Sequence, residues 1–441
     1  MDTISAVSFC LAAILVTDSI FRKTDFFSPA RMYLFFQSMA LGISFLALDK
    51  QMTPFHPFTY LVYFASIACF LLGVVTVKII DGLSSHRPIH PLDLRRYNWN
   101  AHLFFAFTLF FIFAGGMFIA YRGTGEFPLL AKVKSEAIRS FFAYKWAASV
   151  ALSYGGVAMA LFFIYVFRPS RLSKIVNIGL WMTVVTAVIF SLALSRGGLM
   201  FFAAFALVFY HYGIRRISMA KLFVYFMIFS ALILVSGYLK VNGFQQELQQ
   251  QHEIKIKTSK IVQLALRLPY MYIANNFWNL DYALNPLSFQ ERHPTTYGFT
   301  SLSGLLGLMA FPGSGGNLAE SIEKNEHFDG QFNEQAIKIK GWNTVSYQWS
   351  FYKDFGVIGV FLGSFLIGML LHMLYLKICR QPTMLTLSAY SYSAFFVADS
   401  CFGSFFESPI YVYGFLYVCA CCYFSQIVLP GTAPVLTKTS R

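Results

Sequence analysis

Apolar stretches long enough to cross a lipid bilayer dominate this chain, and shorter polar segments separate them. A helix needs roughly 20 mostly apolar residues to cross the hydrocarbon core of a membrane. About eleven stretches approach that length, so the pattern predicts an all-α, polytopic integral membrane protein. The expected spans are 3–21, 32–48, 57–80, 101–121, 146–167, 175–194, 198–213, 221–239, 349–376, 383–400 and 409–429.

Basic residues concentrate in every second connection between these spans. Loop 81–100, for example, carries Arg87, Arg95 and Arg96. Because cytoplasmic loops collect Lys and Arg, the alternation predicts that the N-terminus faces the outer side of the membrane and the C-terminus the cytoplasm. The chain begins Met1-Asp2, which is acidic where a signal peptide is basic, so we interpret 3–21 as a retained first span.

The composition is typical of a membrane protein and gives no sign of a nucleic-acid partner. The chain is 57% apolar and 12% charged, against about 25% charged in an ordinary soluble protein. Its net charge of +14 is explained by basic cytoplasmic loops, and we expect no nucleic-acid partner because no basic run or nucleic-acid motif occurs. Cys419, Cys421 and Cys422 stand in an apolar stretch without His or carboxylate, which favours small buried hydrophobes over a metal or redox motif.

One connection, 240–348, is far longer than the 2–8 residues usual between helices, which indicates that it is functional. The chain therefore divides into an N-terminal bundle of about eight spans, this large outer loop, the C-terminal spans and a cytoplasmic tail. Within the loop, 244–280 is amphipathic and predicts a helix with a kink or break at Pro269. Two interpretations stay open: a helix lying on the membrane surface, or a wall over an active site. The four regions are 1–239, 240–348, 349–429 and 430–441.

An arginine interrupts the apolar pattern in "SLALSRGGLM", between two expected spans on the outer side. An ionisable residue at membrane depth indicates a functional site. We expect Gly197 and Gly198 to allow a tight turn there, and the fork of donors on Arg196 suits a phosphate group. The alternative is that Arg196 only reaches toward the polar surface of the membrane.

Other arginines fall on the same predicted side. Arg267 stands alone among leucines and alanine, so its charge needs a partner or an anion. Arg139 shares its segment with Lys134 and Glu136, and there a solvated helix face is an equal alternative. The remaining two are Arg122 and Arg292.

No pattern for a metal or for ATP is present in the sequence. His86 and His90 have the spacing of two ligands on a helix, but Pro88 lies between them and disfavours that helix. Neither a D-x-D motif nor the phosphate-binding pattern G-x-x-x-x-G-K-[ST] occurs. We therefore expect neither a bound metal nor ATP-driven transport.

Three stretches resemble the O-antigen polymerases, the Wzy family of oligosaccharide repeat unit polymerases. "GEFPLLAKVKSEAIRSF" resembles a G-x-P-L-L stretch followed by an arginine, although one extra residue precedes the proline here. "SLALSRGGLM" resembles the S-R turn of the family. "NTVSYQWSFYKDFGVIGVFLGSFLIGML" resembles its N-T segment before a late span, with Y-x-D-F-G-x-x-G. Together with the hydropathy, the likeness covers about residues 100–375.

The resemblance implies a GT-C type glycosyltransferase of the bacterial inner membrane that works without a metal or other cofactor. Its substrates, donor and acceptor, would be oligosaccharides carried on undecaprenyl pyrophosphate, joined on the periplasmic side. Membrane lipids are the other expected contact, and a chain-length regulator and a flippase are the expected protein partners.

The expected site follows from this chemistry. Without a metal, positioned arginines must stabilise the charge that develops on the pyrophosphate, and the acceptor hydroxyl needs a base. Asp354 is one candidate base, with an ion pair at a helix start beside Lys353 as the alternative. The catalytic arginines would be Arg196, Arg267 and Arg139, and the substrate contacts Arg122, Arg292, Tyr272, Asn343 and Tyr352. The further candidate bases, among which the sequence does not choose, are Glu126, Glu136, Glu291 and His293.

Two competing functions remain. The related O-antigen ligases usually carry H-N at the boundary where this chain has Trp342 before Asn343, which favours a polymerase. A flippase for lipid-linked oligosaccharides would line a continuous cavity with polar residues in many spans, whereas here the polar residues gather in one outer loop and on one face.

Overall fold

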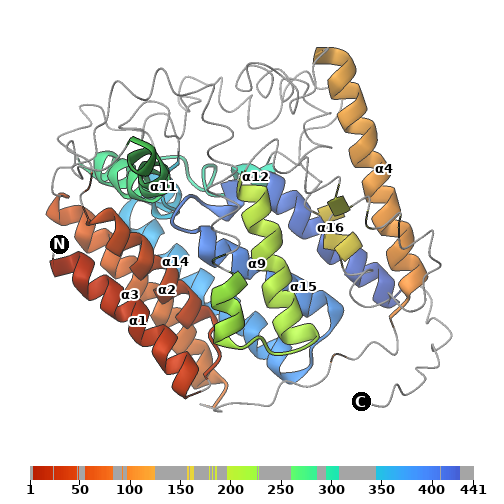
Figure 1. Cartoon of the computed structure of the whole chain (residues 1–441), viewed down its shortest axis with the longest axis horizontal. Coiled ribbons are helices and arrows are strands. Elements are labelled where there is room, and N and C mark those ends of the chain that lie inside the picture. The colour runs from red at the N-terminus through yellow and green to blue at the C-terminus, as the bar shows by residue number, and fades with distance from the viewer. Residues whose placement is uncertain are drawn as a thin grey trace. The chain divides into compact units, whose positions relative to one another are not determined.

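A computed structural model gives the fold of this chain (Figure 1). It describes residues 3–22, 24–46, 55–82, 97–124, 196–225, 260–285, 295–306, 344–407 and 409–427, with scattered positions at 48, 92, 227 and between 156 and 185. Within these residues every regular element is a helix, which confirms the predicted all-α class for the part of the chain that is described.

Three helices in the described residues are long and apolar enough to cross a membrane: α1 (Thr3–Phe21), α3 (Pro57–Ile80) and α14 (Gln348–Arg380). The bounds of α1 and α3 coincide with two predicted spans. Membrane association is therefore supported, while the count of eleven spans and the orientation stay predictions. The predicted 146–167 and 175–194 lie almost wholly outside the described residues.

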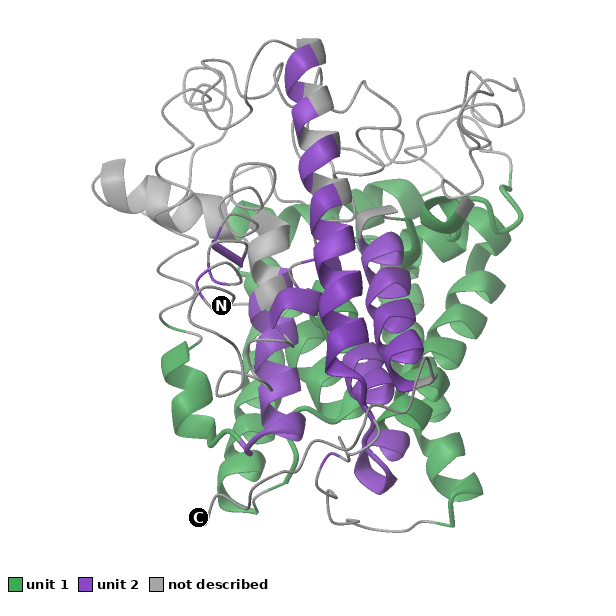
Figure 2. Ribbon diagram, turned by 90° about the vertical axis from the view of Figure 1, so that its right-hand side faces the viewer, with its two compact units in different colours: residues 1–85, 217–375, 393–408 green, residues 86–216, 376–392, 409–441 purple. Residues whose placement is uncertain are grey.

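The chain forms two compact units that are discontinuous in sequence (Figure 2). Their boundaries pass through α14 and through α15 (Met384–Asp399). Unit 1 comprises 1–85, 217–375 and 393–408, and unit 2 comprises 86–216, 376–392 and 409–441.

Unit 1 is built on α1, α2 (Pro29–Ser44) and α3, with α11 (Lys260–Leu284) lying across the end where α2 stops and α3 starts (Figure 1). Prolines at the first positions of α2 and α3 start both helices, because a proline there loses no internal hydrogen bond. We call this end of unit 1 the α3-start end. Short elements α12 (Ser303–Leu306) and η3 (Phe405–Glu407) also belong to unit 1.

Helix α14 is two helical segments joined by a sharp reversal at Phe355 and Gly356, where Gly356 has φ of 63°. In a straight helix Phe351 and Gly359 would be about 12 Å apart along the axis. Here a Cβ placed on Gly359 would lie 2.3 Å from the Phe351 carbonyl oxygen, so the first segment folds back along the second. The predicted span 349–376 is therefore not one straight helix, because glycines let segment 348–354 pack beside the rest of it.

Unit 2 contains α4 (Trp99–Thr124), α9 (Arg196–Gly213) and α16 (Pro409–Ile427). His102 on α4 is fully buried, and its ring nitrogens bond the Tyr97 hydroxyl (2.5 Å) and the Ala160 carbonyl (2.9 Å). Cys421 on α16 lies 3.5 Å from the same imidazole. Cys421 and Cys422 are buried free thiols, as the interpretation of small buried hydrophobes predicts, whereas Cys419 is only half-buried.

Candidate functional site

The predicted arginines divide between the two units. Arg196 is the first residue of α9 in unit 2, so Gly197 and Gly198 belong to the first helical turn and do not form the tight turn expected there. Arg267 lies in α11 of unit 1, and this helix continues through Pro269 without the expected break. For both arginines the structure describes the backbone alone. The expected site residues Arg139, Arg292, Asn343, Glu291 and His293, with Glu126 and Glu136, lie outside the described residues.

Arg122 is exposed near the end of α4 in unit 2. Its guanidinium lies 5.9 Å from the ring centroid of Phe118, one turn earlier on the same helix. A cation over an aromatic ring at an exposed site is a weak attraction, worth about 0.5–1 kcal/mol. The side chain is thus held loosely and can exchange this contact for a ligand.

The second half of α11 is enclosed in unit 1 on almost every side. From Tyr270 to Leu284 each residue is buried or half-buried except Tyr272, which is 41% exposed. Its residues Tyr270, Met271, Ala274 and Trp278 form a core cluster, against which Ile43, Leu46, Leu48 and Phe55 pack. A helix resting on a membrane surface would expose one polar face, and this half of α11 does not, while a wall over an active site stays a prediction.

Asparagines on α11 hold the segment that precedes α14. Asn279 donates to the Thr344 carbonyl oxygen (2.9 Å) and to the Asn275 side-chain oxygen (2.9 Å). Asn275 in turn donates to the Thr344 hydroxyl (3.3 Å). Both amides are fully buried, and buried polar groups of this kind must be paired. The sequence reasoning missed these residues, although the run "ANNFWN" in an apolar helix was a visible signal.

Asp281 fixes the other side of α11. Its carboxylate accepts hydrogen bonds from the His56 backbone N–H (2.8 Å) and the Thr59 hydroxyl (2.7 Å) at the start of α3. A carboxylate at a helix N-terminus pairs with unsatisfied backbone donors and with the positive end of the helix dipole. Asp281 therefore joins the large loop to the transmembrane bundle.

Asp354 holds a second loop segment, 295–306. It is fully buried, and it accepts hydrogen bonds from the Thr296 hydroxyl (2.5 Å), the Thr300 N–H (3.0 Å) and the Ser301 N–H (2.7 Å). These donors occupy both carboxylate oxygens, an arrangement that anchors a loop. Whether the same group also acts as a base stays a prediction.

Aromatic residues cover the place where the loop meets α14. Tyr352, an expected substrate contact, packs its ring 6.3 Å from Trp349 and 6.5 Å from Phe58 at the start of α3. Lys353 is almost fully buried, with its Nζ 5.9 Å from the Trp349 ring centroid. Tyr297 and Phe355 are instead 71% and 53% exposed. The sequence reasoning did not single out these two.

A polar network lies beneath this end, between α2, α3 and α14. Tyr347 shares hydrogen bonds of 2.8 Å with the Tyr33 hydroxyl and the Ser364 hydroxyl. Gln37 donates to the Ser400 hydroxyl (2.8 Å), and Tyr63 donates to the Gln37 side-chain oxygen (2.6 Å). Hydrogen bonds between helices stabilise membrane bundles, so we interpret the network as structural. Burial raises the pKa of the nearby Cys401 thiol, which keeps it protonated.

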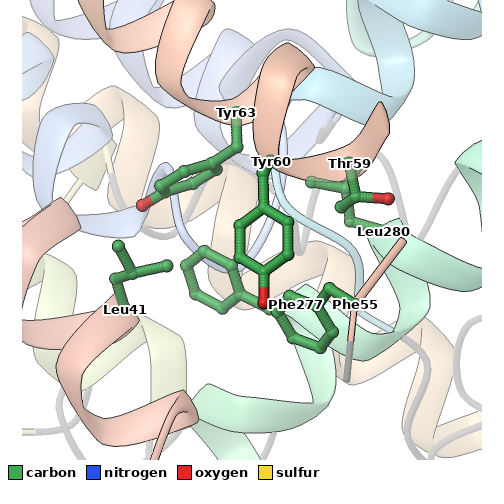
Figure 3. A pocket seen from close by; sticks show the side chains of 7 residues that line it. All are labelled: Leu41, Phe55, Thr59, Tyr60, Tyr63, Phe277 and Leu280. Atoms are coloured by element: carbon green, nitrogen blue, oxygen red, sulfur yellow. The ribbon is translucent and has the colours of Figure 1, made fainter. Parts of the chain in front are cut away.

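A small apolar hollow opens between α2, α3 and α11 (Figure 3). Its free volume is about 10 Å³, roughly that needed by one water molecule. The rings of Tyr60, Tyr63 and Phe277 converge on it, with Phe55 at the side. Among the described residues that line it none is charged, and its free volume is too small for a ligand group, so the hollow is a packing feature of the bundle.

The described residues contain no group of three or more His, Cys, Asp or Glu side chains that could hold a metal ion. No protein-family model, no curated protein and no solved structure matches this chain.

Proposed function

We propose that this protein is a membrane-embedded glycosyltransferase that joins oligosaccharide repeat units carried on undecaprenyl pyrophosphate. One observation carries the proposal: within the stretch that resembles the polymerases, 343–370, Thr344 and Asp354 are hydrogen-bonded to residues of the large loop. Asn275 and Asn279 hold its start at Thr344, and Asp354 binds loop 295–306 at the reversal. The large loop is thus joined to the bundle at the motif itself.

The position of α11 supports a role for Arg267. Arg267 precedes Asn275 by eight residues, which is about 12 Å along a helix. The half of α11 that carries Asn275 is anchored to the α3-start end by Asp281 and by the Tyr270 hydroxyl, which accepts from the Leu48 N–H (3.1 Å). A rigid helix can therefore hold an arginine at a fixed place over this end, as a phosphate site requires.

The proposed reaction transfers a glycan from its lipid carrier to a sugar hydroxyl. The hydroxyl oxygen of the acceptor attacks the anomeric carbon of the donor, and the bond from that carbon to the pyrophosphate oxygen breaks. The acceptor proton passes to a base, and the lipid pyrophosphate leaves with the bonding electrons. Arg196, Arg267 and Arg139 are the proposed groups that stabilise its negative charge, because arginine keeps its charge and binds phosphate with two donors.

Orientation is part of the proposal. With the N-terminus periplasmic and the C-terminus cytoplasmic in a bacterial inner membrane, the α3-start end and α11 face the periplasm, where the lipid-linked units would be joined. The basic connections 81–100 and 168–174 support this orientation.

Deletion of the gene, followed by gel analysis of surface glycolipids, tests the proposal. A strain that lacks a polymerase carries a single repeat unit on its lipid core, so the ladder of longer chains disappears. Bare core would instead indicate a ligase, and an unchanged ladder would contradict both transferases. Accumulation of lipid-linked units on the cytoplasmic side would indicate a flippase.

A further inference from the structure

Tyr297 is exposed, and its backbone has a conformation that is unfavourable for tyrosine. The Phe299 N–H donates to the Thr296 carbonyl oxygen (3.0 Å), which closes a four-residue turn with Tyr297 and Gly298 at its centre. Both central residues have positive φ, 50° and 94°. Turns with positive φ at both central positions favour Asn, Asp or Gly, because a Cβ crowds the backbone there. Glycine meets that demand at the second position, whereas the first holds a tyrosine.

The surrounding structure enforces this turn. Asp354 binds Thr296 on one side of Tyr297 and binds Thr300 and Ser301 on the other. The Thr296 N–H also donates to the Lys353 carbonyl oxygen (3.2 Å). A strained residue persists where its neighbours over-determine its conformation, and such residues gather at ligand sites. The backbone of Tyr297 is therefore held in a fixed position, from which its side chain extends.

A second exposed ring lies beside the turn. A Cβ placed on Gly298 would lie 3.7 Å from Cζ of Phe355, the residue at the reversal of α14. Tyr297 is 71% exposed and Phe355 is 53% exposed, so most of both rings stays uncovered. We call these two residues the aromatic platform. Neighbouring exposed apolar side chains mark interaction sites when they form a contiguous surface.

We propose that the aromatic platform binds a sugar ring of the glycan substrate, an inference that rests on the proposed function. A pyranose presents a face of C–H groups that stacks on an aromatic ring, while its hydroxyls stay in water. The negative face of the ring attracts those C–H hydrogens, so the contact needs a flat π-system as well as apolar area. The site would orient the glycan beside the loop that Asp354 anchors.

A membrane interface is the other occupant that exposed aromatic residues suggest. Leu302 and Leu305 follow the turn and are 43% and 42% exposed, so apolar anchoring is already available. An anchor in lipid does not depend on where one backbone position is held, and therefore gains nothing from a strained tyrosine with positive φ. Pre-organisation does benefit a ligand site, because it lowers the entropy lost on binding.

The test is binding of oligosaccharides released by mild acid from the surface polysaccharide of the cell that makes this protein. The purified full-length chain in detergent is titrated and followed by saturation-transfer NMR. We expect Tyr297→Trp to bind as the wild type does, because it keeps a π-face. Tyr297→Leu keeps apolar area without that face, and should weaken binding roughly three- to tenfold, the size of one lost aromatic contact.

Two further variants make the result interpretable. Tyr297→Asn should lose binding while its thermal unfolding temperature stays equal or rises, because Asn tolerates positive φ. Tyr423→Leu on α16 replaces a tyrosine that is 49% exposed elsewhere in the chain, and should bind normally.

The proposal is overturned if the wild type binds no oligosaccharide, or if Tyr297→Leu binds as tightly as the wild type. In the second case, reduced partition of Tyr297→Leu into phospholipid vesicles would identify a membrane anchor. Failure of the proposed function is detected by a different experiment, the gel analysis of surface glycolipids from the deletion strain.

Discussion

Replacement of Gly368 by alanine should destabilise unit 1, because α3 and α14 touch through their backbones. A Cβ on Gly368 would lie 2.1 Å from the Phe70 carbonyl oxygen, and a Cβ on Gly73 would lie 2.1 Å from the Phe365 carbonyl oxygen. Ordinary contacts begin at 3.4 Å, so the helices must separate by roughly 1.3 Å, the difference between these distances. Close approach through small residues is how many membrane helices associate.

The loss of stability caused by Gly368→Ala can be estimated from general values for overpacking and helix propensity. Forcing extra volume into a packed interface costs about 1–3 kcal/mol, and the better helix propensity of alanine returns at most about 1 kcal/mol. A compact unit of this size loses about 2–4 °C of melting temperature per kcal/mol, so a decrease of several degrees is expected. Gly73→Ala should behave alike, and the double variant should lose less than the sum, because one separation relieves both clashes.

Thermal unfolding in detergent, followed with a thiol-reactive dye, measures this effect, because Cys401 in unit 1 is a buried free thiol. Gly115→Ala on α4 is the matched control, since a Cβ there meets no atom within 4 Å. Equal unfolding temperatures for Gly368→Ala and Gly115→Ala would refute the proposed packing of α3 on α14.

Three other predictions follow. Arg196→Ala should abolish the polysaccharide ladder at normal protein level, and Arg196→Lys should reduce it strongly because the two-donor fork is lost; a full ladder from the Ala variant would contradict the proposed role, and a full ladder from the Lys variant would indicate that Arg196 only reaches toward the membrane surface. Asp354→Asn turns an amide NH₂ toward a donor in loop 295–306, so amide hydrogen exchange should accelerate there; unchanged protection would show that another contact holds the loop. Reporter fusions should read periplasmic after residues 130 and 300 and cytoplasmic after 90, 171 and 218, and an outward reading at 90 would reverse the orientation.

Hydropathy alone predicted where the helices of the bundle lie. The bounds of α1 and α3 agree with the expected 3–21 and 57–80. The length of an apolar run is a local property of the sequence, so it can be predicted without knowledge of distant contacts. The expected 32–48 was displaced, since helix α2 starts at Pro29, where a proline is a favourable first residue. Of the expected site residues, Tyr352 and Asp354 do lie where the loop meets the bundle.

Long-range contacts decided the course of α14 and the hydrogen-bond partners of the buried polar residues. The hydropathy of 349–376 reads as one span, yet the Gly356 conformation and the contact of Phe351 with Gly359 and Gly363 fold its first part back. The roles of Asn275 and Asp354 likewise depend on partners 69 and up to 58 residues away in sequence. Periodicity reports which face of a helix is apolar, but it carries no information about which distant donor meets a given acceptor. That pairing is set only when the helices pack. The aromatic platform depends on it too, because Asp354 of α14 holds the loop that carries Tyr297.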